Sequence, residues 1–150
     1  MTDRFSPPKD KADFLKELVG KDSPFNEFRD VLFFAAVVGF HEDRRVALSA
    51  RGEAIRWDVM SNRLGTEIVM DMIAVATDLD DKELLSGARK DERVAILEEY
   101  ANGGLEVLKE RIGTAGVLPL DTVIIHLLQE YMHSDQSPDS TGLADKVLNL

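Results

Sequence analysis

Carboxylates are the most numerous reactive side chains in this chain, which has 28 Asp and Glu residues against 18 Lys and Arg. Glu98 and Glu99 are adjacent, and adjacent side chains on a helix diverge by about 100°, so this pair cannot act on one substrate atom. Asp78, Asp80 and Asp81 resemble the start of a calcium loop, but the glycine and the glutamate that such a loop needs further on are missing. We therefore interpret these acids as helix caps and solvated side chains.

The other common catalytic arrangements are also missing from the sequence. There is no cysteine, which excludes disulfides, thiolate metal sites and a cysteine nucleophile. The three histidines, His41, His126 and His133, form no metal-ligand pair such as HExxH. Neither a phosphate-binding Gly-Lys-Ser/Thr loop nor a GxSxG elbow occurs. The sequence therefore predicts no catalytic residues, no metal site and no cofactor, and we expect a protein that is not an enzyme.

One short stretch, LEEYANGGL at residues 97–105, combines residue types that are uncommon on a helix. Asn and Gly disfavour helix interiors, each Gly by about 1 kcal/mol relative to Ala, so their presence needs a reason beyond helix propensity. One interpretation is a surface at which the two glycines admit the backbone of a partner protein. The candidate partner-binding residues are Glu98, Glu99, Tyr100, Asn102, Gly103 and Gly104. The alternative, which the residue types favour, is an internal role, with Asn102 as a cap and the glycines at a bend that fits the core.

Four arginines form the candidate basic cluster: Arg44, Arg45, Arg51 and Arg56. They lie in a charged, irregular segment at residues 41–63 and are mixed with acids at positions 42, 43 and 53. The net charge is −10 and the pI is about 4.7, so the chain as a whole repels phosphate backbones. DNA contact through these arginines is one hypothesis, although a mixed solvated surface is favoured. An acidic mimic of DNA is another, and the interspersed bases argue against it.

Periodic apolar residues predict the helices that must position these groups. We expect helices near residues 14–19, 24–38, 64–76, 81–85, 92–112 and 119–131. Ser23 and Pro24 are typical of a helix start, and Gly39 is typical of a helix end. The predicted fold class is all-α, an irregular single-domain bundle of about five to six helices. We expect a flexible lead-in at residues 1–8, the helical domain at 9–133, and a polar linker with a short C-terminal helix at 134–150.

The sequence also bears on location and assembly. The N-terminal residues lack the apolar core of a signal peptide, and the longest apolar run, Val31–Val38, is far shorter than the ~20 residues that span a bilayer. We therefore expect a cytoplasmic protein without a membrane partner. A homo-oligomer is a further hypothesis, because the apolar content of residues 25–40, added to two further apolar stripes, is large for one small bundle to cover.

Two stretches taken together resemble small proteins associated with bacterial DNA phosphorothioation (Dnd) systems. The first is FRDVLFFAAVVGF at residues 28–40, which is followed by the basic pair Arg44-Arg45, and the second is EEYANGGL at residues 98–105. The resemblance covers residues 10–132 and excludes the segment from Ser134 onward. It implies a non-catalytic accessory or regulatory subunit of an antiphage modification–restriction system, with other proteins of that system as partners. It assigns a catalytic role to no residue.

Overall fold

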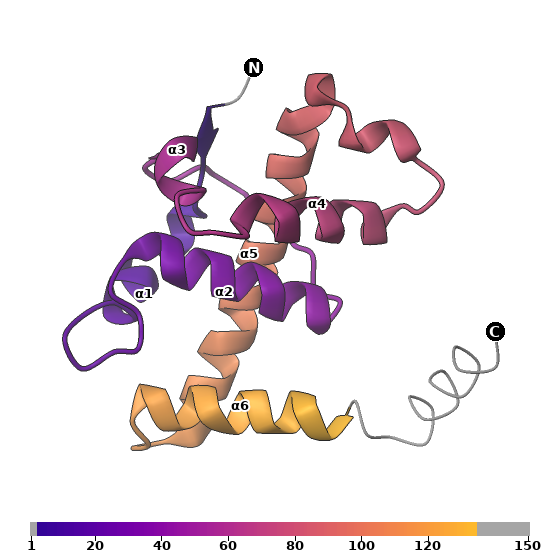
Figure 1. Cartoon of the computed structure of the whole chain (residues 1–150). Helices are drawn as coiled ribbons and strands as arrows, with labels where there is room; N and C mark the ends of the chain where they lie inside the picture. Colours follow the sequence, from indigo (N-terminus) through magenta and orange to yellow (C-terminus); the bar gives the residue numbers. More distant parts are fainter. Residues whose placement is uncertain (1–2, 135–150) are drawn as a thin grey trace, which may run out of the picture. The chain divides into compact units, whose positions relative to one another are not determined.

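The computed structural model describes residues 3–134, and nearly all of their regular structure is helical (Figure 1). The α-helices are α1 (Ala12–Glu17), α2 (Phe28–His41), α3 (Trp57–Met60), α4 (Thr66–Thr77), α5 (Lys90–Ala115) and α6 (Leu120–Ser134). Short 3-10 helices are η1 (Lys9–Lys11), η2 (Lys82–Leu85) and η3 (Gly87–Arg89). Strands β1 (Arg4–Phe5) and β2 (Ile55–Arg56) form one antiparallel pair, with Phe5 opposite Ile55. The predicted all-α fold class is confirmed.

By its internal contacts the chain divides into two compact units, residues 1–111 and residues 112–150. The first unit contains every element from β1 to η3 and most of α5. In the second unit, Val123, Ile124 and Leu127 are buried along α6. The predicted C-terminal helix and most of its linker, residues 135–150, lie outside the described residues.

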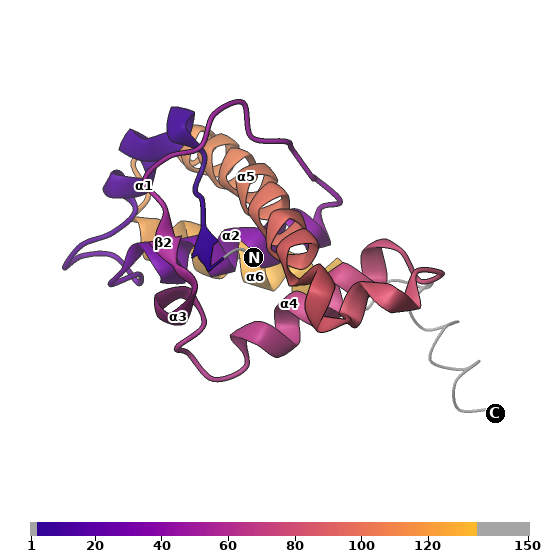
Figure 2. The ribbon, with the colours of Figure 1, turned by 90° about the horizontal axis from the view of Figure 1, so that it is seen from above.

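The core of the first unit is built where α2 crosses α5 (Figures 1 and 2). On α2 the side chains of Val31, Leu32, Ala35 and Val38 are buried. A Cβ atom on Gly39 would overlap the backbone carbonyl of Tyr100. The prediction that Gly39 ends the helix is therefore wrong. Gly39 lies inside α2, where the missing side chain lets the backbone of α5 come close.

The predicted start of α2 is also wrong, because the helix begins at Phe28 rather than at Pro24. The hydroxyl of Ser23 donates a hydrogen bond to the carbonyl of Leu18 and accepts one from the Phe25 amide at 3.1 Å. Ser23 thus closes the turn between α1 and α2 instead of capping the helix. The same local preference of serine for backbone groups serves both roles, so the sequence signal was ambiguous.

Residues 3–11, which we call the N-terminal arm, are built into the fold, so the predicted flexible lead-in is wrong for residues 3–8. Phe5 is fully buried and Pro8 is almost fully buried. Backbone hydrogen bonds join the arm to the segment that follows α2: Trp57 donates to Asp3, Gly52 to Pro7 and Lys9 to Ala50. Residues 42–56, which we call the excursion, therefore run beside the arm (Figure 2). The excursion is irregular, as its charged sequence predicted.

Candidate functional site

Most of the predicted partner-binding residues are buried, so the stretch at residues 98–104 is not a surface for a partner. Glu98 is 4% exposed and Asn102 is 2% exposed, while Tyr100, Gly103 and Gly104 are buried as well. Among the six candidates, Glu99 alone is partly exposed. The role of this stretch is therefore internal, as the alternative proposed, but Asn102 lies in the middle of α5 rather than at a cap.

Glu98 fastens the arm to α5. Its carboxylate accepts a hydrogen bond from the Ser6 amide at 2.5 Å and pairs with the guanidinium of Arg51 at 3.2 Å. Burial raises the pKa of the Glu98 carboxyl, and the Ser6 amide and the Arg51 charge act in the opposite direction. Glu98 thus holds both the arm and the excursion on one side of α5.

Asn102 performs a similar role one helical turn further on. Its side-chain oxygen accepts a hydrogen bond from the ammonium of Lys11 at 2.5 Å, and its side-chain nitrogen donates to the carbonyls of Val46 at 3.2 Å and Ala47 at 3.3 Å. The Lys11 ammonium also lies 3.5 Å from Glu106. Both the oxygen and the nitrogen of this buried amide are therefore hydrogen-bonded within the protein.

The glycine pair admits two segments of the same chain rather than a partner backbone. A Cβ on Gly104 would overlap the carbonyl of Ala35 in α2, and a Cβ on Gly103 would overlap the carbonyl of Arg44 in the excursion. The helix α5 continues through both glycines without a break. Of the structural reasons that a glycine pair suggests, close backbone approach is the one that applies here.

The four candidate arginines are each paired with a carboxylate. Arg44 contacts Glu110 at 2.8 Å and Arg45 contacts Glu99 at 2.9 Å. Arg51 pairs with Glu98, and Arg56 pairs with Asp58 at 2.7 Å. Because each guanidinium already has a counter-charge, the cluster does not form the continuous basic face that phosphate backbones attract.

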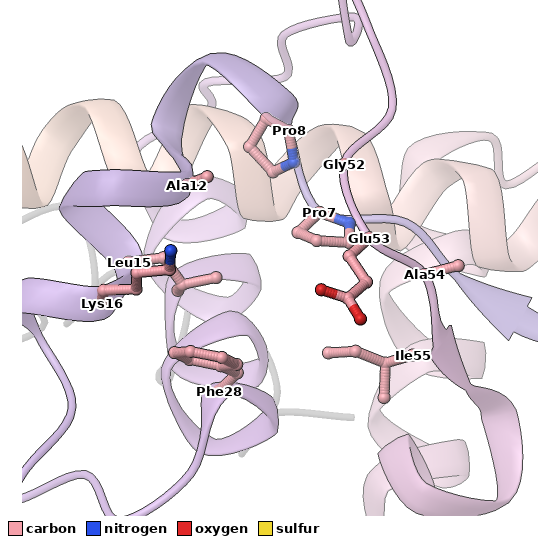
Figure 3. A pocket seen from close by; sticks show the side chains of 10 residues that line it. All are labelled: Pro7, Pro8, Ala12, Leu15, Lys16, Phe28, Gly52, Glu53, Ala54 and Ile55. Carbon is pink, nitrogen blue, oxygen red and sulfur yellow. The ribbon is translucent and has the colours of Figure 1, made fainter.

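A pocket of about 250 Å³ opens between the arm, α1, the start of α2 and the excursion (Figure 3). Its apolar walls come from Pro7, Pro8, Ala12, Leu15, Phe28, Ala54 and Ile55. Figure 3 shows Glu53 projecting from the excursion side, with Leu15 and Phe28 on the opposite side. The pocket has the size and the lining of a site for one apolar side chain. No local sequence signal predicted it, because its walls come from separate segments.

A second recess of about 410 Å³ follows α4, and we call it the α4 groove. It is lined by Ile68, Asp71, Met72, Val75, Ala76, Leu79 and Leu85. Four of these side chains, Ile68, Met72, Leu79 and Leu85, are between 49% and 72% exposed. The opposite face of α4, with Met70, Ile73 and Ala74, is buried in the core. The helix is therefore apolar on two faces, and one of them faces solvent.

The described part of the chain has neither a metal site nor a single helix that could cross a membrane. Among residues 3–134, no group of three or more His, Asp or Glu side chains is placed to hold a metal ion. No single helix in the same range has both the length and the apolar content to cross a bilayer. The stretches 87–115 and 120–134 pass that test when they are taken together, by length and composition alone.

The described residues define an α-helical protein whose polar network is internal and whose arm pocket and α4 groove are lined mainly by apolar side chains. A family model described as DNA sulphur modification system-associated protein 4 matches residues 4–145. The chain therefore belongs to this Dnd-associated family, which confirms the resemblance seen in its sequence. Neither the curated proteins nor the solved structures gave a match.

Proposed function

We propose that this protein is a non-catalytic interaction subunit that binds another protein of a DNA sulphur modification system through the α4 groove. Membership in a family associated with such systems supports the choice of partner. The exposed apolar side chains of the groove carry the proposal. Apolar patches of this kind on a protein surface mark protein–protein contacts more often than chance.

The energetics fit a reversible contact. Complete burial of one large apolar side chain contributes about 1.5–3 kcal/mol. The four exposed side chains of the groove are already partly covered, so a partner gains roughly 1 kcal/mol from each, or about 4 kcal/mol in total. A micromolar complex needs about 8 kcal/mol. The groove therefore supplies the apolar centre of an interface whose remaining affinity comes from polar contacts around it.

The two alternative functions have less support. DNA contact through Arg44, Arg45, Arg51 and Arg56 would require breaking ion pairs that the structure forms within the molecule. A DNA mimic presents a band of acids, whereas acids such as Asp81 and Glu92 are paired with Arg89. Docking through the apolar α4 groove requires neither the breaking of these ion pairs nor a band of unpaired acids.

Co-purification tests the proposal. The full chain would be tagged and co-expressed with the other proteins encoded in a DNA sulphur modification locus, together with a Met72→Glu variant and a Leu64→Glu control. Met72 lies in the groove, whereas Leu64 is fully exposed and lies outside it. We expect the wild type and the control to retain one protein of the system and Met72→Glu to lose it. Failure of the wild type to retain any of them would contradict the proposal.

A further inference from the structure

The shape of the α4 groove selects the secondary structure of its occupant. Ile68, Met72 and Val75 recur along one face of α4, and Leu79 and Leu85 form the other wall. Within α4 the groove runs from Ile68 to Ala76, which corresponds to about 12 Å along the helix, or roughly two turns. The backbone groups of α4 are used within the helix, so an extended segment docked here would find no edge to pair with. A helix brings its own backbone hydrogen bonds and so fits an apolar groove.

Ion pairs within the protein use three of the bases near the groove. Arg93 binds Asp71 at 2.9 Å, and Arg89 binds Asp81 at 2.7 Å. Lys90 lies 3.5 Å from Glu67. These contacts pair Glu67 and Asp71 on α4, and Asp81 on the segment with Leu79 and Leu85, with bases of the same protein.

The segment at residues 78–85, which is the rim on the other side of the groove, has more acidic than basic residues. Asp78, Asp80 and Glu83 are exposed around the Leu79–Leu85 wall and form no salt bridge with any residue in the described range 3–134. Lys82 is the one basic residue in this short segment. An occupant with Lys or Arg along its edge would be attracted to this rim, and one with Asp or Glu would be repelled.

The same charges argue against a second copy of this chain as the occupant. Two α4 grooves placed face to face would bring the acidic rims together, and each copy carries a net charge of −10. Like charges across an interface oppose association. The occupant must therefore come from a chain with a different charge pattern.

From these observations we infer that the α4 groove binds an amphipathic helix with basic edges, supplied by the partner protein. The inference rests on the proposed function and specifies the chemistry of the partner. Leucine-like side chains of the helix fill the space between Met72 and Leu85, and its Lys or Arg residues lie over Asp78, Asp80 and Glu83.

Two designed helical peptides of about 16 residues test this inference. They share the same leucine positions at helical spacing and differ only at the edges, which carry Lys in one peptide and Glu in the other. The full chain would be labelled at its methionine methyl groups and titrated with each peptide at 0.15 M salt. We expect the Lys-edged peptide to shift the Met72 resonance saturably and the Glu-edged peptide to bind at least ~10-fold more weakly. The Met72 resonance would be assigned by its loss in Met72→Leu.

Matched variants locate the binding. Met72→Glu and Ile68→Glu place a charge in the groove and should weaken the Lys-edged peptide at least ~10-fold, because a buried unpaired carboxylate is costly. Since Met72→Glu lacks the Met72 methyl group, the affinities of the variants would be measured from the fluorescence anisotropy of labelled peptide. Leu64→Glu adds the same charge outside the groove and should leave the affinity within about twofold. Circular dichroism would verify that all three variants fold, which is expected because these side chains are solvent-exposed.

Several outcomes would overturn the inference. Equal binding of the two peptides, no shift at Met72, or equal weakening by Leu64→Glu and Met72→Glu would each do so. Sedimentation that shows a dimer dissociated by Met72→Glu would identify a second copy as the occupant instead. If co-purification succeeds and the peptides fail, the proposed function stands without this partner chemistry. If the peptides bind and co-purification fails, the proposed function is wrong.

Discussion

At the scale of single residues, Asn102 joins three segments that are distant in the sequence. It accepts a hydrogen bond from Lys11 in the arm and donates two to the carbonyls of Val46 and Ala47 in the excursion. An amide suits this position because it donates and accepts at once, whereas a carboxylate only accepts. The unusual presence of asparagine within a helix is thus explained by tertiary contacts.

Replacing Asn102 with leucine should destabilise the protein strongly. The change leaves the buried ammonium of Lys11 and two backbone carbonyls without their amide partner, and we expect a loss of about 3 kcal/mol in the free energy of unfolding. Urea titration would measure it. Glu106→Gln is the matched control, since it removes only the charge of a more exposed partner of Lys11 and should cost less than about 1 kcal/mol. A cost for Asn102→Leu as small as that of the control would contradict the role of the amide.

At the scale of elements, the crossing of α2 and α5 depends on small residues from both helices. Gly39 and Ala35 on α2 face Tyr100 and Gly104 on α5, and the Arg44 carbonyl rests on Gly103. Such contact brings the two backbones closer than larger side chains permit. This crossing also positions the start of the excursion, because Arg44 follows the end of α2 closely and its backbone packs against Gly103.

Replacing glycines of α5 with alanine should lower the stability of the protein at two positions and raise it at a third. Alanine ordinarily stabilises a helix by about 1 kcal/mol relative to glycine. At Gly103 and Gly104 the added methyl meets backbone atoms that cannot rotate away, so we expect each variant to lose about 3 kcal/mol. At Gly113 an added Cβ meets no atom within 4 Å, and we expect a gain of about 1 kcal/mol. Thermal or urea unfolding would measure all three. Stabilisation by all three would show that the crossing is not so close.

Apolar periodicity predicted the long helices well, because α4 and α5 repeat their buried residues at three- and four-residue steps. Features without a regular spacing of apolar residues were not predicted from the sequence. The strands of the arm and the excursion are two residues long, and a single buried Phe5 gives no pattern. The same limit applies to the two recesses. The stripe at Ile68 and Met72 was visible in the sequence, but only the structure shows that it faces solvent.

At the scale of the whole molecule, the carboxyl groups whose pKa is shifted fall into two groups with opposite effects on pH dependence. Arg89 lowers the pKa values of Asp81 and Glu92, so the stability that they contribute is present above the ordinary carboxyl pKa and is lost as the pH falls. Burial raises the pKa of Glu98. Its contribution is full below the ordinary pKa and is lost as the pH rises through the raised value.

A Glu98→Gln variant isolates the effect of the raised Glu98 pKa on the stability of the protein. Glutamine keeps an oxygen for the Ser6 amide and cannot ionise, so it escapes the loss that Glu98 suffers as the pH rises. We expect the stability of the variant relative to the wild type to increase from about pH 4 to about pH 7. Free energies of unfolding at three pH values in this range would show it. A constant or decreasing difference would mean that the Arg51 pair outweighs the effect of burial.

The attachment of the arm to α5 also sets an order of events during protein synthesis. Ser6 and Lys11 bind residues that lie 92 and 91 positions later in the chain. A ribosome that adds about 5–20 residues per second makes these binding partners roughly 5–20 s after the arm. Throughout that interval the core in which Phe5 and Pro8 are buried lacks the middle of α5. An early-made segment of this protein is therefore one of the last to reach its native position, and until then it is accessible to chaperones and proteases.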